Sequence, residues 1–231
     1  GKHIRHIEAD LRDTDALALA FDEAKPESVF HLAAQAGVRK GWGQDFSVYT
    51  VCNIEATQVL LEACARTQLH RVVYASSSSV YGDDAVIPMR ETHRPQPVSP
   101  YGVTKLAAEH LCYLYWVGHG VPTVSLRYFT VYGPRQRPDM AFNRFLRAMA
   151  SDEPISLYGD GEQTRDYVFV RDVVSANMLV SDLELPTSGD LDDRAFNVGT
   201  GVGTSVIGLA EVLESVASVK PGRKHEGERA G

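Results

Sequence analysis

The sequence predicts an α/β protein in which a doubly wound parallel sheet is followed by a smaller C-terminal α/β domain. Three apolar runs, Ser28–Ala34, Arg71–Ser76 and Thr123–Tyr128, have the length and the β-branched and aromatic content of buried strands. Segments with helical periodicity separate these runs. Strands that are apolar on both faces and alternate with helices are typical of parallel sheets covered on both sides. After Gly133 the pattern changes to shorter elements between glycine-rich turns.

Each element of the first half has its own pattern. Apolar runs bounded by turn or charged residues predict the strands, and apolar residues three and four positions apart predict the helices. In chain order we expect a strand at His3–Ala9, a helix at Thr14–Glu23, a strand at Ser28–Ala34, a helix at Asn53–Arg66, a strand at Arg71–Ser76, a helix at Tyr101–Trp116 and a strand at Thr123–Tyr128.

The second half is expected to form a smaller cap domain. Apolar residues recur at helical spacing in Phe142–Met149, and Ala195–Val198 has the composition of a short strand. A further helix is expected over Thr204–Ala217, with Thr204 or Ser205 as its N-cap.

The strand Thr123–Tyr128 is the last element of the alternating pattern, so we place the domain boundary directly after it. The predicted domains are residues 1–128 and 129–231. Residues 195–217 carry another strand and helix, and this segment can return to the sheet of the first domain.

The composition excludes several classes of function. The 231 residues include 23 basic and 30 acidic side chains, which gives a formal net charge of −7. This charge argues against non-specific binding to nucleic acid or to an anionic membrane. The sequence also has no run of about 18 apolar residues, the length that a membrane span needs. Any nucleotide that the protein binds must therefore be held by local contacts.

The three cysteines predict neither a metal site nor a disulfide framework. Cys52, Cys64 and Cys112 are an odd number, show no C-x-x-C spacing and have no histidines at metal-ligand spacing. This cysteine usage fits a reducing cytoplasm best.

Tyr101 and Lys105 are the first candidate catalytic residues. They are four residues apart at the start of a predicted helix, so both side chains lie on one helix face. A phenol with its ordinary pKa near 10 is a poor base at neutral pH, but a fixed ammonium beside it favours the phenolate. The pair can therefore supply a base, and Lys105 can also reach a ribose hydroxyl. A Tyr-x-x-x-Lys match alone discriminates little, because it also describes an ordinary surface helix pair.

A run of serines strengthens this interpretation. Ser76–Ser79 ends the strand upstream of Tyr101, and ligands bind at the carboxyl ends of strands in open α/β sheets. Hydroxyl groups at this end of a strand can also simply cap the turn that follows.

Seven motifs occur along the chain in a fixed order. They are EADLRD at Glu8–Asp13, VFHLAAQAGVR at Val29–Arg39, NIEAT at Asn53–Thr57, SSSSVYG at Ser76–Gly82, SPYGVTK at Ser99–Lys105, LRYFTVYGPRQRPDM at Leu126–Met140 and YGDGEQTRDYVFVRDV at Tyr158–Val173. In this order they resemble the extended short-chain dehydrogenase/reductase superfamily, and within it the NAD-dependent nucleotide-sugar 4-epimerases. The resemblance covers nearly the whole chain. It implies a Rossmann-like sheet, a substrate-binding cap and the cofactor NAD.

The resemblance also implies roles for individual residues. Tyr101 and Lys105 match the catalytic pair, and Ser77 matches the catalytic hydroxyl. Asn53 would tie the neighbouring backbone. The positions implied to bind NAD are Asp10 and Leu11 at the adenine, Leu32, Ala33 and Ala34 beside the phosphates and the nicotinamide side, and Asn53, Tyr101, Lys105 and Tyr128.

A UDP-sugar is the substrate that the resemblance implies. Arg165 and Arg229 match the arginines that hold the UDP diphosphate, and bidentate guanidinium groups suit phosphate oxygens. Tyr158 falls at a position that lines the uracil pocket, and Ser77, Ser78 and Ser79 would contact the sugar. The related sugar 4,6-dehydratases carry Asp-Glu where this chain has two serines, which disfavours dehydration.

Thr130 and Arg137 indicate which sugar is bound. UDP-galactose 4-epimerases commonly have asparagine at the position of Thr130, whereas this segment looks like that of the UDP-glucuronate 4-epimerases. A buried carboxylate needs hydroxyl donors and a cation. We therefore expect 4-epimerisation of UDP-glucuronate to UDP-galacturonate. A UDP-glucose or UDP-N-acetylglucosamine 4-epimerase, a UDP-glucuronate decarboxylase and a non-catalytic nucleotide-sugar-binding fragment remain as alternatives.

Two further expectations follow from the resemblance. The helices at Asn53–Arg66 and Tyr101–Trp116 resemble those of a four-helix dimer interface, so a homodimer is expected by analogy. The superfamily also begins with a G-x-x-G-x-x-G turn that receives the pyrophosphate, and this sequence contains no such motif. We expect the chain to be a portion of a longer one whose preceding segment carries much of the cofactor site.

Overall fold

The computed structural model describes residues 4–38 and 41–227. These residues form two compact units. The first contains the chain up to Arg127 together with Ala176–Asn197, and the second contains Tyr128–Ser175 together with the chain from Val198 onward.

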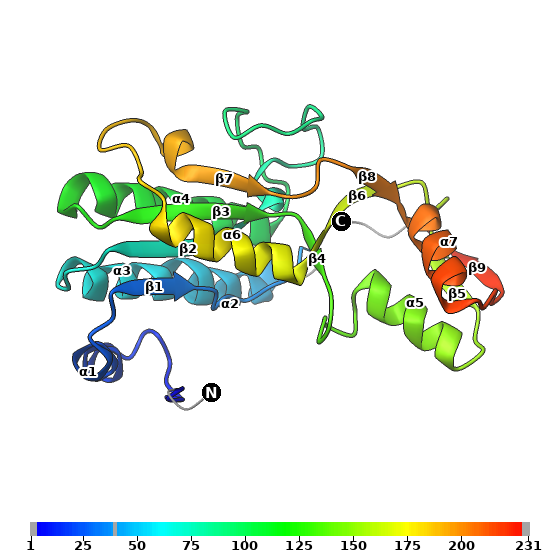
Figure 1. Cartoon of the computed structure of the whole chain (residues 1–231), viewed down its shortest axis with the longest axis horizontal. Helices are drawn as coiled ribbons and strands as arrows, with labels where there is room; N and C mark the ends of the chain where they lie inside the picture. The colour runs from blue at the N-terminus through cyan, green and yellow to red at the C-terminus, as the bar shows by residue number, and fades with distance from the viewer. Residues whose placement is uncertain (1–3, 39–40, 228–231) are drawn as a thin grey trace. The chain divides into compact units, whose positions relative to one another are not determined.

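A four-stranded sheet forms the centre of the first unit. Its strand order is β1-β2-β3-β7, and all four arrows point the same way in Figure 1. β1 pairs in parallel with β2, with Ser28 opposite Arg71. The bounds are Ser28–His31 for β1, Arg71–Ser77 for β2, Thr123–Tyr128 for β3 and Ala195–Val198 for β7. The predicted parallel sheet is therefore present.

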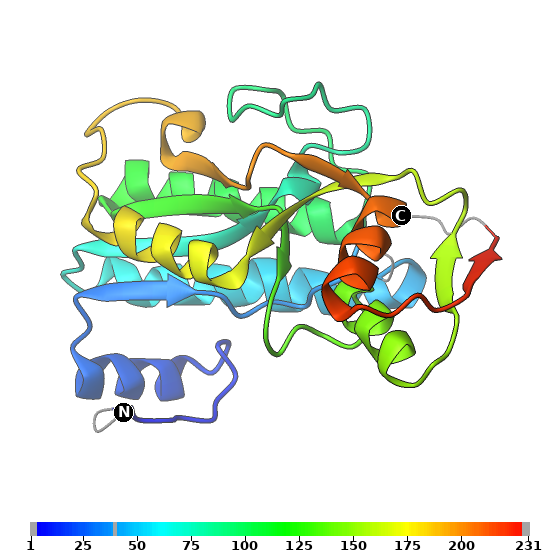
Figure 2. The ribbon, with the colours of Figure 1, turned by 45° about the vertical axis from the view of Figure 1, so that its right-hand side comes forward.

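Helices cover both faces of this sheet. Figures 1 and 2 show α3 and α4 on one face and the C-terminal part of α6 on the other. The bounds are Thr14–Ala24 for α1, Phe46–Thr50 for α2, Ala56–Ala65 for α3, Pro100–His119 for α4 and Val170–Asp182 for α6. A π-helical turn, Val51–Glu55, joins α2 to α3, so helical structure begins earlier than the sequence indicated. Leu61, Val72 and Ala108 are among the buried residues that pack α3, β2 and α4 together.

The limits of α4 follow from its sequence. The Ser99 hydroxyl accepts a hydrogen bond from the Gly102 amide over 3.0 Å, and Pro100 occupies the first helical position. Both features are typical of helix N-termini. Gly120 ends the helix in the left-handed region at φ 70°. The helix therefore begins where Tyr101 can project from its first turn.

The predicted strand at His3–Ala9 is wrong for the residues that the structure describes. Residues 4–9 have no regular secondary structure, and Ile4 is 87% exposed. A strand needs a neighbour to accept and donate its backbone hydrogen bonds, and in the described sheet β1 pairs with β2 alone. β1 is also shorter than predicted, because it ends at His31 and leaves Leu32–Ala34 beyond the ladder.

The described residues of the second unit form two small sheets, the helices α5 and α7, and the N-terminal part of α6. β4 (Thr130–Tyr132), β6 (Thr164–Phe169) and β8 (Gly203–Ser205) form one sheet in the order β4-β6-β8. β5 (Ile155–Tyr158) pairs in parallel with β9 (Arg223–Glu226). α5 (Ala141–Ala150) and α7 (Val206–Ala217) pack on them through a core that includes Phe145, Ile155, Leu157 and Leu209.

Ser205 is the N-cap of α7, as one of the two predicted alternatives had it. Its hydroxyl accepts a hydrogen bond from the Gly208 amide over 3.0 Å, so the helix begins at Val206. Three short 3-10 helices complete the fold, at Gly43–Asp45 (η1), Ser78–Val80 (η3) and Leu191–Arg194 (η4). Among the helices that the structure describes, none is long and apolar enough to cross a membrane.

Candidate active site

Lys105 is buried between two aromatic rings. Its side chain lies on α4 and the residue is 2% exposed. The Nζ atom is 4.8 Å from the ring centroid of Tyr74 and 5.8 Å from that of Tyr101. It donates a hydrogen bond to the main-chain oxygen of Ala75 over 2.7 Å. Cations over aromatic faces are attracted by the ring quadrupole, so both rings favour the ammonium form beside Tyr101.

Burial opposes this charge. Desolvation lowers the pKa of Lys105 from 10.5 to about 8, and Cys112 and the Glu109 carboxylate act in the opposite direction. The ammonium form therefore still prevails near pH 7. A positive charge held at this distance from the Tyr101 ring is what a catalytic phenolate requires.

Ser77 ends β2 and is oriented by its own neighbours. Its Oγ atom lies 2.9 Å from the Oγ of Ser79 and accepts a hydrogen bond from the Ser79 amide over 3.2 Å. The residue is buried, whereas Ser78 and Ser79 are half-buried in η3. Three hydroxyl groups thus follow one another at the carboxyl end of a parallel strand, where α/β sheets bind ligands.

Gly102 brings the start of α4 close to these serines. A Cβ atom at this position would lie 2.5 Å from the main-chain oxygen of Ser79. Only glycine permits this approach of the helix to η3. The structure therefore brings Tyr101 and the serine segment together in the first unit.

Asn53 joins three parts of this site. Its Oδ1 atom accepts a hydrogen bond from the Gln35 amide over 2.7 Å, and its Nδ2 atom donates to the Gln35 oxygen over 3.1 Å. The same Nδ2 atom donates to Thr104 Oγ1 over 2.9 Å. Because Thr104 lies between Tyr101 and Lys105, Asn53 fixes the segment after β1 relative to α4.

The segment after β1 presents small and apolar side chains. Leu32 and Ala33 are exposed and Ala34 is half-buried. They follow β1 at its carboxyl end, beside the neighbouring carboxyl end of β2. A surface of this kind allows close approach of a flat ligand.

Asp10 and Leu11 lie in the segment before α1. Asp10 forms an exposed ion pair with Arg12, with 2.7 Å between Oδ2 and Nη2. The hydrogen bonds from Arg12 lower the pKa of Asp10 to about 2. Leu11 packs against the core between α1 and α3. Asp10 is thus ionised and is an acceptor for hydroxyl groups.

Five of the expected ligand residues lie in the second unit. Tyr128 is half-buried directly before β4, and Thr130 lies in β4 opposite Tyr167 of β6. Arg137 pairs with Asp139, with 3.0 Å between Nη2 and Oδ2, and both side chains are exposed. In this structure Arg137 is bound to a nearby carboxylate, which a substrate carboxylate would have to replace.

Tyr158 and Arg165 are the other two expected ligand residues of the second unit. The guanidinium carbon of Arg144 lies 5.0 Å from the ring centroid of Tyr158, and Arg144 donates to the Tyr158 hydroxyl over 3.3 Å. Arg165 is exposed in β6 and donates to the main-chain oxygen of Thr164 over 2.8 Å. Arg229 lies outside the described residues.

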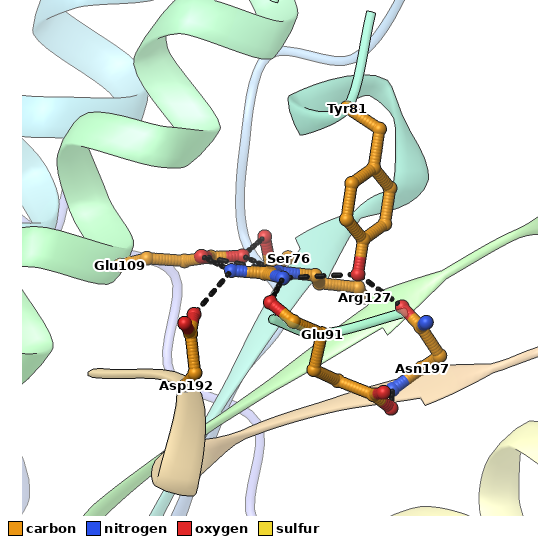
Figure 3. Close-up of polar contacts among 7 residues, drawn as sticks. All are labelled: Ser76, Tyr81, Glu91, Glu109, Arg127, Asp192 and Asn197. Carbon is orange, nitrogen blue, oxygen red and sulfur yellow. Dashed lines mark hydrogen bonds and ion pairs between the residues drawn. The ribbon is translucent and has the colours of Figure 1, made fainter. Parts of the chain in front are cut away.

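Sequence reasoning missed a group of buried polar residues behind the serines. Ser76, Glu109 and Arg127 form a hydrogen-bonded cluster that also includes Tyr81 (Figure 3). Two signals were available. Glu109 is four residues after Lys105 on α4, and Arg127 is a charged residue in β3, whose other residues carry no charge.

Over the described part of the chain, no group of three or more His, Cys, Asp or Glu side chains is arranged to hold a metal ion. The three cysteines carry free thiols. Burial raises the pKa of Cys64 to about 12, so this thiol is unreactive at neutral pH.

Comparison with known proteins agrees with this geometry. The model of the NAD dependent epimerase/dehydratase family matches residues 1–199. The chain belongs to this family. Members that resemble it include an uncharacterized UDP-glucose epimerase of Bacillus subtilis, 43% identical over 83% of this chain and 59% of the relative. A probable UDP-glucuronate 4-epimerase of Rhizobium meliloti is 38% identical over 76% of this chain and 51% of the relative. The chain thus spans between half and three fifths of these two epimerases.

Solved structures of family members share the fold. The UDP-glucuronic acid 4-epimerase of Bacillus cereus, in complex with UDP-glucuronic acid and NAD, is 39% identical, with a TM-score of 0.85 over 97% of this chain and 69% of that one. The UDP-glucose 4-epimerase of Thermotoga maritima is 32% identical, with a TM-score of 0.90 over 100% of this chain and 74% of that one. The expected Rossmann-like α/β fold and the expected family are therefore confirmed.

Proposed function

We propose that the protein is an isomerase, an NAD-dependent 4-epimerase that interconverts UDP-glucuronate and UDP-galacturonate through a 4-keto sugar. The observation that carries the proposal is the placement of Tyr101 beside the buried ammonium of Lys105, where α4 meets the serines after β2. A family member of known structure binds UDP-glucuronic acid and NAD.

The residues of the first unit fit part of an NAD site. Lys105 donates one described hydrogen bond, to Ala75, and an ammonium group has three donors, so it can also bind ribose hydroxyls. Exposed Leu32 and Ala33 leave room for a flat ligand at the end of β1. In this proposal Asp10, Leu11, Ala34, Asn53, Tyr101 and Tyr128 complete the residues of this chain that hold the cofactor.

Tyr101 then acts as the general base at the sugar. The Lys105 ammonium stabilises the phenolate form of Tyr101, and this phenolate takes the proton from the O4 hydroxyl and becomes a neutral phenol. Ser77 donates a hydrogen bond to O4 and stabilises the negative charge that develops there as the proton passes to Tyr101. The chemistry that NAD supplies when bound is reversible hydride transfer at C4 of the sugar.

The second unit supplies the nucleotide contacts in this proposal. Arg165 and Arg229 hold the diphosphate, and Tyr158 lines the uracil pocket. Thr130 and Arg137 of this unit bind the sugar carboxylate, and Ser78 and Ser79 are the hydroxyl groups that the first unit offers to the sugar. The sugar must turn over between the two hydride transfers, so tight contacts to UDP and loose contacts to the sugar suit the reaction.

A neutral UDP-hexose is the second candidate substrate. The Bacillus subtilis relative is named a UDP-glucose epimerase, and Arg137 is exposed and already paired with Asp139.

Incubation of the protein and NAD with UDP-glucuronate or with UDP-glucose, followed by separation of the products, distinguishes the two candidate substrates. We expect UDP-galacturonate from the first substrate and at most slow conversion of the second. Efficient conversion of UDP-glucose alone would reject the uronate, and release of CO2 would indicate a decarboxylase.

We also propose that the protein is a cytoplasmic homodimer. Three free thiols suit a reducing compartment. Val103, Leu114 and Val117 are exposed on α4, and their spacing of 11 and 3 residues places them on one helix face. An apolar stripe of this kind suits a helix-to-helix interface with a second copy.

A further inference from the structure

A buried ion pair lies behind the serine segment. The Arg127 and Glu109 side chains are both 0% exposed, with 2.8 Å between Nη2 and Oε2. Arg127 Nε also donates to Glu109 Oε1 over 3.0 Å. The hydroxyl of Ser76 donates to the same Oε1 atom. Figure 3 shows the two side chains meeting between α4 and β3, with Ser76 beside the carboxylate.

Arg127 extends this cluster beyond the serines. Its Nη1 atom donates to the Tyr81 hydroxyl over 2.9 Å and to the Glu91 main-chain oxygen over 3.1 Å. The Tyr81 hydroxyl donates in turn to Asn197 Oδ1 over 2.7 Å. We call Ser76, Glu109, Arg127 and Tyr81 the buried polar cluster.

Stability alone does not account for an ion pair in this place. Removing two charges from water costs as much as their attraction returns, and apolar residues of similar volume are often as stable. Every polar atom of the buried polar cluster has a partner in the described structure. A fully satisfied network of this kind makes one arrangement of the surrounding backbone more rigid than others.

The arrangement that it fixes is that of α4 against β2. Lys105 and Glu109 are one helical turn apart on α4, and they bond to the consecutive β2 residues Ala75 and Ser76. Two adjacent contacts from one helix face leave no freedom to slide by one residue. Ser77 follows directly after this junction, and Tyr101 lies one turn before Lys105.

The cluster also holds the serine segment at both ends. Ser76 precedes Ser77–Val80 and bonds to Glu109, while Tyr81 follows this segment and bonds to Arg127. Because Glu109 and Arg127 are bonded to each other, the two ends of the segment are tied to one rigid pair.

We propose that the buried polar cluster is a positioning device that holds Ser77–Ser79 in place relative to Tyr101 and Lys105. The inference rests on the proposed epimerase activity for its catalytic consequence. Misplacement of a catalytic group by about 1 Å can cost on the order of 100-fold in rate. None of the four residues need touch the substrate for such an effect.

Position 76 allows a matched test. Ser76→Thr and Ser76→Val add the same volume to a buried strand residue, but only threonine keeps the hydroxyl that bonds to Glu109. Thr123→Val is the control, because the buried Thr123 hydroxyl also donates to α4, at the Cys112 oxygen over 2.8 Å, away from the serines. Each valine variant loses one buried hydroxyl hydrogen bond.

The readouts are Tm, kcat and KM for UDP-glucuronate, and amide hydrogen exchange over residues 77–81. We expect Ser76→Val and Thr123→Val each to lower Tm. We expect Ser76→Val alone to lower kcat by about tenfold or more, with KM within about twofold, and to speed exchange at residues 77–81. Ser76→Thr should restore both properties. Equal kcat losses in both valine variants, or no loss in Ser76→Val, would overturn the proposal.

The exchange measurement separates this proposal from the proposed function. If the unmodified protein converts no UDP-sugar, the epimerase assignment fails and the cluster is judged by exchange alone. Faster exchange at residues 77–81 in Ser76→Val, but not in Thr123→Val, then supports the positioning role. Unchanged exchange in Ser76→Val rejects it.

Discussion

Lys105 donates a hydrogen bond to the main-chain oxygen of Ala75 over 2.7 Å, and this contact joins the helix α4 to the strand β2. The ammonium that makes it is almost completely buried. Desolvation destabilises a charge in such a place, so the contribution of Lys105 to the stability of the protein depends on pH.

The first prediction concerns stability at alkaline pH. The pKa of Lys105 is about 8 in the folded protein and near 10.4 in an unfolded chain. Between these values the unfolded state binds more protons, so this group makes stability rise with pH. The unfolding free energy of the unmodified protein, measured relative to that of Lys105→Met, should increase by on the order of 3 kcal/mol from pH 7 to pH 10.5. Urea unfolding of both proteins across this range measures the difference. A constant difference would contradict the burial of a charged Lys105.

The second prediction concerns acid. His31 is buried and bonded through Nε2 to Thr57 Oγ1 over 2.8 Å. Burial, followed by the charge of Lys105, lowers the pKa of His31 to about 4. The unfolded state therefore binds the proton first as pH falls, and stability is lost between about pH 6.5 and pH 4.

His31→Gln should remove this part of the acid sensitivity, on the order of 3 kcal/mol at the acid end of the range. His70→Gln, at an exposed histidine, should leave it unchanged. Unfolding measured at pH 7 and at pH 4.5 compares the three proteins. Identical losses of unfolding free energy in all three proteins would show that His31 is already protonated in the folded state at pH 4.5, which contradicts the prediction.

The third prediction compares two glycines of α4. Gly102→Ala places a Cβ 2.5 Å from the Ser79 oxygen, whereas a Cβ at Gly118 meets nothing within 4 Å. We expect Gly102→Ala to destabilise the protein by about 1–3 kcal/mol and to lower kcat, because the helix must move away from η3. Gly118→Ala should stabilise it by up to about 1 kcal/mol through helix propensity. Thermal unfolding and turnover of both variants test this, and equal effects would mean that the close approach at Gly102 does not matter.

The fourth prediction tests the proposed dimer. Leu114→Glu places a charge on the exposed apolar face of α4, and Val212→Glu does the same at an exposed residue of α7. Light scattering should give a dimer for the unmodified protein and for Val212→Glu, but a monomer for Leu114→Glu. A monomer in all three proteins would reject the homodimer.

The central sheet and the start of α4 could be predicted from the sequence because their signals are local. β2 and β3 are apolar runs, and Ser99-Pro100 marks the start of α4. The segment at residues 4–9 has similar apolar residues, but a strand also requires a partner, which no local pattern reveals. The short strands β4 and β6 were missed for the same reason, since they pair across more than 30 residues of sequence.

The buried polar cluster was missed, although Glu109 and Arg127 stand out in the sequence, because charged residues are normally exposed. From the sequence alone, Glu109 is expected to face solvent on α4. The pairing of β3 in the sheet places the Arg127 guanidinium opposite it. The ion pair is thus a property of the tertiary fold. Arg137 and Arg165 could be proposed as ligand residues from their motifs, but their side-chain partners in the structure could not be predicted.

The most direct test of the account follows the hydrogen at C4 during the reaction. The protein and NAD are incubated with UDP-glucuronate in D2O, and the product is examined by mass spectrometry and NMR, with Tyr101→Phe in parallel. We expect UDP-galacturonate that carries no deuterium at C4, because the same hydride leaves and returns, and we expect Tyr101→Phe to be slower by on the order of 100-fold or more. Deuterium at C4, or an unchanged rate in Tyr101→Phe, would contradict the mechanism.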